Sequence, residues 1–311
     1  MSAATSNAVP VAMTRCAAYA RQAVERATGE ILDACGWQPA AGSRVLVKPN
    51  LLKTSPLACT HPEVTRAACA WLLDRGVQVI VADSPGFGTA RGVAEAIGLA
   101  SALADLGLAV RGMGDPVSVA LPDGGSWGVS RLALECDALL SVPRVKAHAQ
   151  MRVTLAVKNL FGCVCGLRKA VAHTVQGNTP GVFETCVAAL WQALPPVAGL
   201  ADGITAMHVT GPSGGKPFQL GLLAASPCAV ALDAAVYAVL GVMPSDIPVW
   251  RALIRRGAPG AFAENIRYPL QTPQDVPAKG FILPETLADV SFRPHRLAWS
   301  VCRRIWRSLR P

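Results

Sequence analysis

Apolar strand patterns and helical patterns alternate along the first half of the chain, and this order limits the fold more than any other feature. Arg44 to Lys48 is a short β-branched run that ends at Pro49. Val77 to Ala82 and Leu108 to Met113 are further apolar strands, and a helical pattern precedes each of them. This β-α-β-α-β order predicts an α/β fold with a doubly wound, mostly parallel sheet and helices on both faces.

The two helices of this unit have recognisable ends. Thr60 and Glu63 stand three residues apart, which is the spacing of a capping box with Thr60 as the N-cap. Gly76 then ends the first helix. A turn at 84–88 precedes the second helix, which we expect to continue to about Leu106.

The second half is a less regular elaboration of the same fold. Asp202 ends an apolar segment, and Pro227 divides the longest nearly uncharged stretch into a buried strand and a buried helix. No repeat or low-complexity linker interrupts the sequence, so we predict one α/β domain over residues 1–290 and a separate tail at 291–311. The expected elements are strands at 138–142 and 220–225 and helices at 152–161, 182–194 and 229–240.

Composition indicates a folded protein with a large core. Hydrophobic residues make up 51% of the 311 residues and charged residues 16%, which is the opposite of a disordered chain. The segment 1–19 holds neither the apolar run of a secretory signal nor a twin arginine, so we expect a cytoplasmic protein. Much of the net charge of +9 lies in the C-terminal tail and no nucleic-acid motif is present, so no nucleic-acid partner is expected.

The strongest electrostatic anomaly is an acid-free segment at 138–183, in a chain that has 20 acidic residues. Clustered Lys and Arg beside glycines and backbone amides suit phosphate or carboxylate groups, so the segment predicts an anion site. A solvated basic face is the alternative, and the charge pattern leaves both open. The segment contains Arg144, Lys146, His148, Arg152, Lys158, Arg168, Lys169 and His173.

Polar side chains also follow several predicted strands at the point where each ends. Lys146 and His148 come soon after the strand at 138–142, and Lys48 and Asn50 lie at the end of the first strand. Asp83 follows the second strand. Ligands of open α/β sheets collect at the carboxyl ends of strands, so these residues predict one convergent site. Taken singly, an Asp or Asn after a strand is more often a turn or a helix cap.

Two glycine-rich loops offer backbone amides to the same kind of ligand. Residues 83–88 precede a helix, so their amides can cradle an anion, although the loop has neither the Walker A form nor the dinucleotide fingerprint. Residues 211–217, which include Ser213 and Gly214, can close over a ligand or form a mobile connection. Neither loop identifies a ligand alone.

Asp233 stands on an otherwise apolar helix and therefore needs a partner. We predict a structural hydrogen bond to a helix N-terminus or to a lysine. A catalytic or ligand-orienting role is the alternative.

The ten cysteines are scattered, and most of them are interpreted as small core residues. Cys163 and Cys165 form the only close pair and lie in the acid-free segment, where two thiols can bind a soft metal or undergo oxidation. His148 or His173 would have to supply further ligands.

The tail from Val290 to Pro311 carries six arginines and no acid, with apolar residues between them. This pattern predicts a basic amphipathic helix that docks on an acidic partner or makes peripheral contact with an anionic membrane. Packing of the tail onto the domain is an equally good alternative.

A series of short motifs gives the chain a family resemblance. The chain resembles the domain of unknown function family 362 over about residues 40–260, and the Lys-x-His and Val-Lys-Asn-Leu-Phe-Gly block is its most specific part. The motifs are Val-Lys-Pro-Asn-Leu (47–51), Thr-His-Pro-Glu (60–63), Asp-Ser-Pro-Gly (83–86), Pro-Arg-Val-Lys-Ala-His (143–148), Thr-Leu-Ala-Val-Lys-Asn-Leu-Phe-Gly (154–162), Asp-Gly-Ile (202–204), Gly-Pro-Ser-Gly-Gly (211–215) and Val-Ala-Leu-Asp (230–233).

The resemblance implies redox chemistry or electron delivery, because many members of that family carry a ferredoxin-like module with iron–sulfur motifs. The C-terminal region here contains only Cys302, so a cluster would come from a separate ferredoxin-like protein. An iron–sulfur cluster and a flavin both remain open as cofactors, since no motif in the sequence specifies either.

The leading hypothesis is an oxidoreductase-like enzyme that acts on an anionic small molecule or cofactor. The alternative is a non-catalytic carrier or assembly protein for a cofactor or an iron–sulfur intermediate, which docks through its basic tail. His148 is the candidate general acid or base, because the reference pKa of histidine lies close to neutrality. The candidate catalytic residues are His148, Lys146 and Asp83, and the candidate anion-binding residues are Lys48, Asn50, Lys158, Asn159, Arg168, Lys169, His173, Ser213 and Gly214.

Overall fold

A nine-stranded, mostly parallel sheet forms the centre of the molecule in the computed structural model, which describes residues 8–165 and 181–288. Parallel pairing joins β5, β4, β3, β8 and β11 in that spatial order, as the α/β prediction requires. Antiparallel pairs add β12 and β2 at one side and β10 beside β9. The strands are β2 (Ala12–Arg15), β3 (Arg44–Pro49), β4 (Gln78–Asp83), β5 (Val110–Gly112), β8 (Ala138–Val142), β9 (Arg144–His148), β10 (Arg152–Thr154), β11 (Val197–His208) and β12 (Lys216–Ser226).

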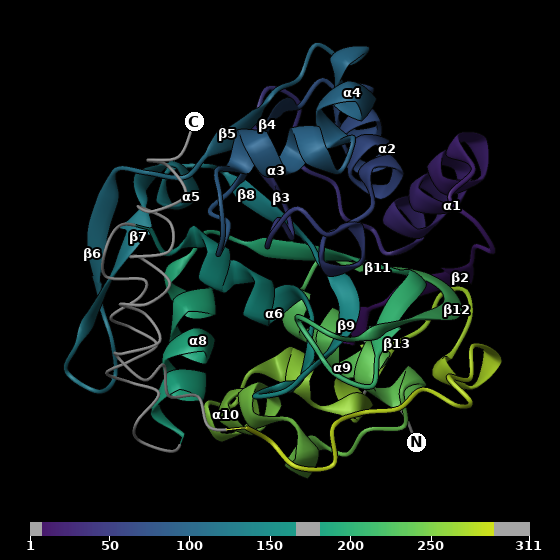
Figure 1. Cartoon of the computed structure of the whole chain (residues 1–311), viewed down its shortest axis with the longest axis vertical. Coiled ribbons are helices and arrows are strands. Elements are labelled where there is room, and N and C mark those ends of the chain that lie inside the picture. The colour runs from purple at the N-terminus through teal and green to yellow at the C-terminus, as the bar shows by residue number, and fades with distance from the viewer. Residues whose placement is uncertain (1–7, 166–180, 289–311) are drawn as a thin grey trace, which may run out of the picture.

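Helices cover both faces of the sheet, so the central strands β3 and β8 are buried on two sides (Figure 1). Alternate residues of β3 show this directly: Val45 and Val47 belong to the core under α1, α2 and α4, whereas Leu46 belongs to the core on the other face. Figure 1 shows α6, α8, α9 and α10 on that second face. The helices are α1 (Arg21–Ala34), α2 (Pro62–Leu73), α3 (Ala90–Ala96), α4 (Leu99–Ala104), α5 (Arg131–Leu134), α6 (Ala156–Asn159), α8 (Val182–Ala193), α9 (Ala229–Val239) and α10 (Pro248–Arg255).

Two small sheets lie outside the central one. A hairpin of β6 (Pro116–Ala120) and β7 (Ser126–Ser130) follows β5, and β1 (Val9–Pro10) pairs in parallel with β13 (Ile266–Arg267). The β1 pairing joins the start of the described chain to its last third.

The strand β11 departs from the sequence prediction because it is much longer than its apolar core. Asp202 does not end this strand, which continues to His208. The first part of β11 pairs with β8 and the later part pairs with β9, so one strand spans both partners. Lys146 and His148 likewise lie within β9, a strand of their own after Pro143, and not in a loop after β8.

Helix boundaries also differ from the predictions in two places. The N-cap of α2 is His61, whose ring accepts a hydrogen bond from the Glu63 N–H, because the Thr60 hydroxyl is engaged elsewhere. The single helix expected up to Leu106 is two helices, α3 and α4, separated at Gly98, whose φ of 82° is unfavourable for other residues. The predicted helix at 152–161 begins only at Ala156.

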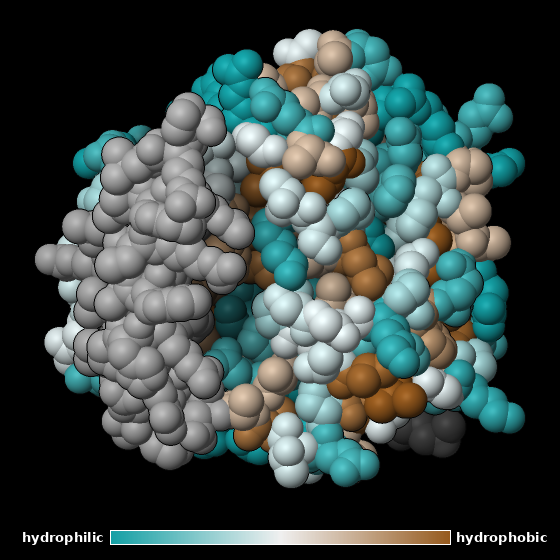
Figure 2. All heavy atoms as spheres, in the orientation of Figure 1, coloured by the Kyte–Doolittle hydropathy of each residue, from teal (hydrophilic) through white to brown (hydrophobic). Residues whose placement is uncertain are grey.

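No helix in the parts of the chain that the structure describes is suited to span a membrane. None of the helices within 8–165 and 181–288 combines the length and the apolar character that a bilayer requires. Figure 2 shows hydrophobic residues in separate patches among hydrophilic ones on the face that it presents. The C-terminal tail at 291–311 lies outside the described residues, so its predicted helix stays a prediction.

Candidate active site

Lys48 and Asp83 form a buried ion pair at the carboxyl ends of β3 and β4. The Lys48 Nζ lies 2.8 Å from Asp83 Oδ1, and both side chains are almost fully excluded from solvent. Asp83 also accepts hydrogen bonds from the backbone N–H groups of Leu51 and Ser84. Gly162 lies directly against the pair, since a Cβ atom at this position would come within 2.4 Å of Lys48 Nζ.

Asn159 joins this ion pair to the next strand end. Its side-chain oxygen accepts hydrogen bonds from Lys48 Nζ and from Asn50 Nδ2, both at 3.0 Å. Its amide nitrogen donates to the Lys48 carbonyl and to the hydroxyl of Ser141. One hydrogen-bonded group therefore connects Asn159 with Lys48, Asn50 and Asp83. The last three are the residues that the sequence predicts at the ends of two strands.

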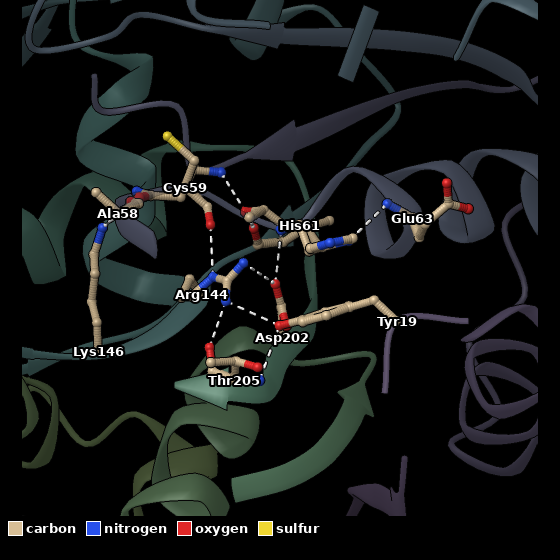
Figure 3. A network of polar contacts seen from close by, with 12 residues as sticks. Tyr19, Ala58, Cys59, His61, Glu63, Arg144, Lys146, Asp202 and Thr205 are labelled. Carbon is tan, nitrogen blue, oxygen red and sulfur yellow. Dashed lines mark hydrogen bonds and ion pairs between the residues drawn. The ribbon is translucent and has the colours of Figure 1, made fainter. Parts of the chain in front are cut away.

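Lys146 extends the group into β9. Its Nζ donates to Asn50 Oδ1 at 2.5 Å and to the Ala58 carbonyl at 2.7 Å. Figure 3 shows the contact with Ala58. Burial lowers the pKa of Lys146 to about 8, because desolvation disfavours the charged amine. This lysine therefore loses its proton at a lower pH than an exposed lysine does.

A second buried ion pair lies beside Lys146 and fixes the backbone between residues 58 and 61. Arg144 Nη2 lies 3.3 Å from Asp202 Oδ2, and Arg144 Nε donates to the Cys59 carbonyl at 2.7 Å. Asp202 accepts from the His61 N–H and from the Tyr19 hydroxyl, each at 2.8 Å. The ring of Tyr19 stacks on the ring of His61, with the two ring centres 3.6 Å apart. Figure 3 shows this network of residues.

A small pocket of about 80 Å³ opens at this edge of the sheet, between β9, β10 and α6. Its described lining contains three cationic side chains and one histidine but no carboxylate, which favours a negatively charged occupant. Lys158 lies on α6 and also contacts the ring of Phe161, with Nζ 4.8 Å from the ring centre. The lining residues are Asn50, Leu52, Pro143, Arg144, Lys146, His148, Thr154, Leu155, Lys158, Asn159 and Pro212.

Arg144 also lines a larger pocket of about 380 Å³, together with Thr60 and His61. That pocket contains Glu63, which is paired with Arg21, so it lacks the purely basic character of the smaller one. The smaller pocket is therefore the better candidate for an anion.

The geometry of His148 restricts its chemical role. Its Nδ1 accepts hydrogen bonds from the backbone N–H groups of Gln150 and Met151. A neutral imidazole whose Nδ1 accepts must carry its proton on Nε2. His148 can therefore act as a hydrogen-bond donor through Nε2, and it can take up a second proton only on Nδ1, with loss of the two backbone contacts.

Asp233 holds the short helix α6 against the sheet. Its two carboxylate oxygens accept from the N–H groups of Ala156 at 2.7 Å and Val157 at 3.0 Å. The predicted structural hydrogen bond to a helix N-terminus is confirmed. Because α6 carries Lys158 and Asn159, Asp233 positions two residues of the pocket although it does not line the pocket itself.

The structure does not bring every predicted residue to the pocket. Ser213 accepts a hydrogen bond from Lys53 at 2.8 Å, and neither Ser213 nor Gly214 lines the pocket, although their neighbour Pro212 does. The predicted residues Arg168, Lys169 and His173 lie outside the described residues.

Cys163 and Cys165 are buried in the core, as predicted for most of the cysteines. Within the described ranges, no group of three or more His, Cys, Asp or Glu side chains is placed to hold a metal ion. A metal role for the pair stays a prediction, because one of its proposed further ligands, His173, is not described.

The sequence singles out none of Arg144, Tyr19 and Ser141 as an individual site residue. Arg144 was counted only as one base of the acid-free segment, yet it is buried and lines both pockets. A usable signal was its place directly after an apolar strand and a proline. Tyr19 carries no signal of this kind, because its partner Asp202 lies 183 residues away.

Comparison with known proteins identifies sequence relatives. The sequence model described as "Domain of unknown function (DUF362)" matches residues 45–238. A thylakoid-associated protein of Synechocystis sp. is 35% identical over 269 residues, which cover 85% of this chain and 84% of that protein.

Solved structures with a similar arrangement are more distant. The lactate racemase apoprotein from Thermoanaerobacterium thermosaccharolyticum aligns with a TM-score of 0.47 at 13% identity, over 73% of this chain and 57% of that one. A protein from Thermotoga maritima aligns with a TM-score of 0.43 at 11% identity, over 66% of this chain and 55% of that one. The chain thus spans a little over half the length of each.

Proposed function

The chain belongs to the domain of unknown function family 362, and on that premise we propose that it is an enzyme acting on a small anionic compound. The observation that carries the proposal is the pocket between β9, β10 and α6, whose described lining is basic and contains no carboxylate. Its position at the carboxyl ends of parallel strands agrees with where α/β enzymes bind ligands.

The residues divide into those that bind and one that reacts. Lys158 and the Nε2–H of His148 offer charged and neutral donors to the anionic group. Arg144 contributes positive potential, but its own donors are engaged by Asp202 and by backbone carbonyls. Lys146 is the reactive group, because burial lowers the pKa of its amine to about 8 and the residue lines the same pocket.

Calorimetric titration tests this proposal with phosphate, acetate, pyruvate and other small acids at low salt. We expect at least one of these anions to bind, and we expect Lys158→Gln to weaken its affinity about 10- to 100-fold, the effect of losing one charged hydrogen bond. Lys279→Gln is the matched control, since Lys279 is exposed and does not line the pocket. Binding of no anion by the unaltered protein would reject the site.

His148→Ala separates catalysis from binding once a substrate is known. We expect this variant to lose turnover while its fold is retained, because the histidine supplies a hydrogen bond to the reacting compound. Unchanged turnover would remove His148 from the mechanism.

An oxidoreductase activity, with electrons from a separate ferredoxin-like protein, is the finer form of the proposal and rests on the family resemblance. Anaerobic purification followed by a visible spectrum and metal analysis tests it. A flavin spectrum, or a broad absorption with iron and sulfide, would support redox chemistry and would justify variants of Cys163 and Cys165. A colourless, metal-free protein would reject a resident cluster or flavin.

Peripheral membrane contact through the tail at 290–311 is a further proposal. Its support is the run of six arginines without an acid, together with the thylakoid association in the name of the Synechocystis relative. Flotation with anionic liposomes tests it, and binding should weaken at high salt. Binding that survives deletion of the tail would reject this role.

A further inference from the structure

The two buried lysines of the site differ in their partners. Lys48 has a carboxylate partner, Asp83, at 2.8 Å. Lys146 has none within 4.0 Å among the described residues, and its two hydrogen-bond partners are the neutral oxygens of Asn50 and Ala58. A buried amine without a counter-charge is held in its neutral form far more easily than a paired one.

The contacts of Lys146 also orient its nitrogen. A neutral primary amine has two N–H bonds and one lone pair. Asn50 Oδ1 and the Ala58 carbonyl, at 2.5 and 2.7 Å, take both N–H bonds. The lone pair is then left for a third direction, and Lys146 lines the small pocket. This geometry presents a nucleophile to whatever occupies that pocket.

The rest of the pocket limits the electrophile. Lys158 and His148 supply donors for a carboxylate, and Leu52, Leu155 and Pro212 add apolar surface to the lining. A volume of about 80 Å³ is the space of roughly three water molecules, so the anionic group and the reacting carbon must lie close together.

We propose that Lys146 forms a Schiff base with the keto carbon of a small 2-oxo acid. This inference rests on the proposed function and deepens it by naming the substrate class. The amine lone pair forms a bond to the carbonyl carbon, and one N–H proton of the amine is transferred to the former carbonyl oxygen to give a carbinolamine. The hydroxyl then leaves as water together with the second N–H proton, and the C=N bond forms, so the step needs no oxidant or reductant.

Borohydride trapping tests the inference on the full-length protein. The protein is incubated with glyoxylate, pyruvate or 2-oxobutyrate and reduced with sodium borohydride, which adds hydride to an imine and fixes the adduct as a secondary amine. Intact mass and peptide mapping then locate the modification. We expect a single adduct on Lys146, its loss in Lys146→Met, and its retention in the control Lys279→Met.

Titration of the same acids by calorimetry separates this inference from the proposed function. Binding of an oxo acid without a trapped adduct on Lys146 would overturn the Schiff base but leave the anion site. Adducts only on exposed lysines would overturn it as well. Neither binding nor an adduct with any of the acids would overturn both. Lys146→Met must show a native circular dichroism spectrum, and direct mapping of the unaltered protein remains decisive if it does not fold.

Discussion

Gly162 lies so close to Asp83 that an added Cβ atom would stand 2.3 Å from the carboxylate oxygen Oδ1. The buried Lys48–Asp83 pair therefore packs directly against this glycine. This contact explains physically why a glycine stands at position 162. It also links the acid-free segment to the strand ends β3 and β4.

Gly162→Ala should therefore destabilise the protein. Neither the carboxylate nor the ammonium can move aside without losing its partner, so we expect a loss of about 1–3 kcal/mol in the free energy of unfolding. Urea denaturation measures it. Gly114→Ala is the control, because its Cβ would meet nothing within 4 Å, and equal losses in the two variants would contradict the packing argument.

Removal of one partner of the Lys48–Asp83 pair should cost more than removal of both. Lys48→Met leaves the Asp83 carboxylate buried without its cation, and we expect a loss of about 3–5 kcal/mol. The double variant Lys48→Met with Asp83→Leu should recover part of that loss. A double-mutant cycle in urea measures the coupling, and additive losses would show that the pair does not interact.

Arg144→Lys should destabilise the segment between residues 58 and 61. Lysine cannot reproduce the planar set of donors that reaches the Cys59 carbonyl, the Tyr19 hydroxyl and Asp202 together. We expect a loss of about 3 kcal/mol in thermal or urea unfolding. Tyr19→Phe removes a hydroxyl that donates to Asp202 and accepts from Arg144 and from the Thr205 N–H, so it should cost about 1–3 kcal/mol.

Asp233→Ala should weaken anion binding from a distance. The variant leaves two buried N–H groups at the start of α6 without acceptors, at about 1–3 kcal/mol each, and releases the helix that carries Lys158. Titration calorimetry should show a lower affinity for the anion, and scanning calorimetry should show a lower melting temperature. Asp74→Ala, at an exposed position, is the control. Unchanged anion affinity would show that the hydrogen bonds from α6 to Asp233 are not needed for anion binding.

The pH dependence of stability should reveal Lys146. Its pKa in the folded state is about 8 and its ordinary value is 10.5, so between these values the unfolded chain binds more protons. Stability attributable to Lys146 must therefore rise with pH from about 8 to 10.5. The difference between the unaltered protein and Lys146→Met isolates this effect and should grow by at most about 3 kcal/mol, from roughly 1.4 kcal/mol per pH unit. A flat difference would contradict the lowered pKa.

Much of the site follows from the order of strands and helices. Lys48, Asn50 and Asp83 were expected together because they end neighbouring parallel strands, and the structure places them within one hydrogen-bonded group. The element types around β8, α8 and α9 also follow from periodicity. These predictions depend on local pattern and on the general geometry of parallel sheets.

The remaining contacts depend on tertiary register, which no local pattern contains. Thr60 has the sequence context of an N-cap, yet its hydroxyl accepts from the Asn50 N–H and donates to the Val142 carbonyl, so His61 caps α2 instead. Asp202 reaches Arg144 only because β11 continues past its apolar segment to pair with β9.

The backbone between residues 58 and 61 has a consequence for how the protein folds. Its carbonyl and amide groups are bound by side chains of Lys146, Arg144 and Asp202, which lie about 85 to 140 positions later in the chain. The first hundred residues can form strands and helices as they leave the ribosome, but they cannot shape the pocket. Assembly of the site must wait for β9 and β11 to dock, so the pocket forms only after long loops of the chain have closed.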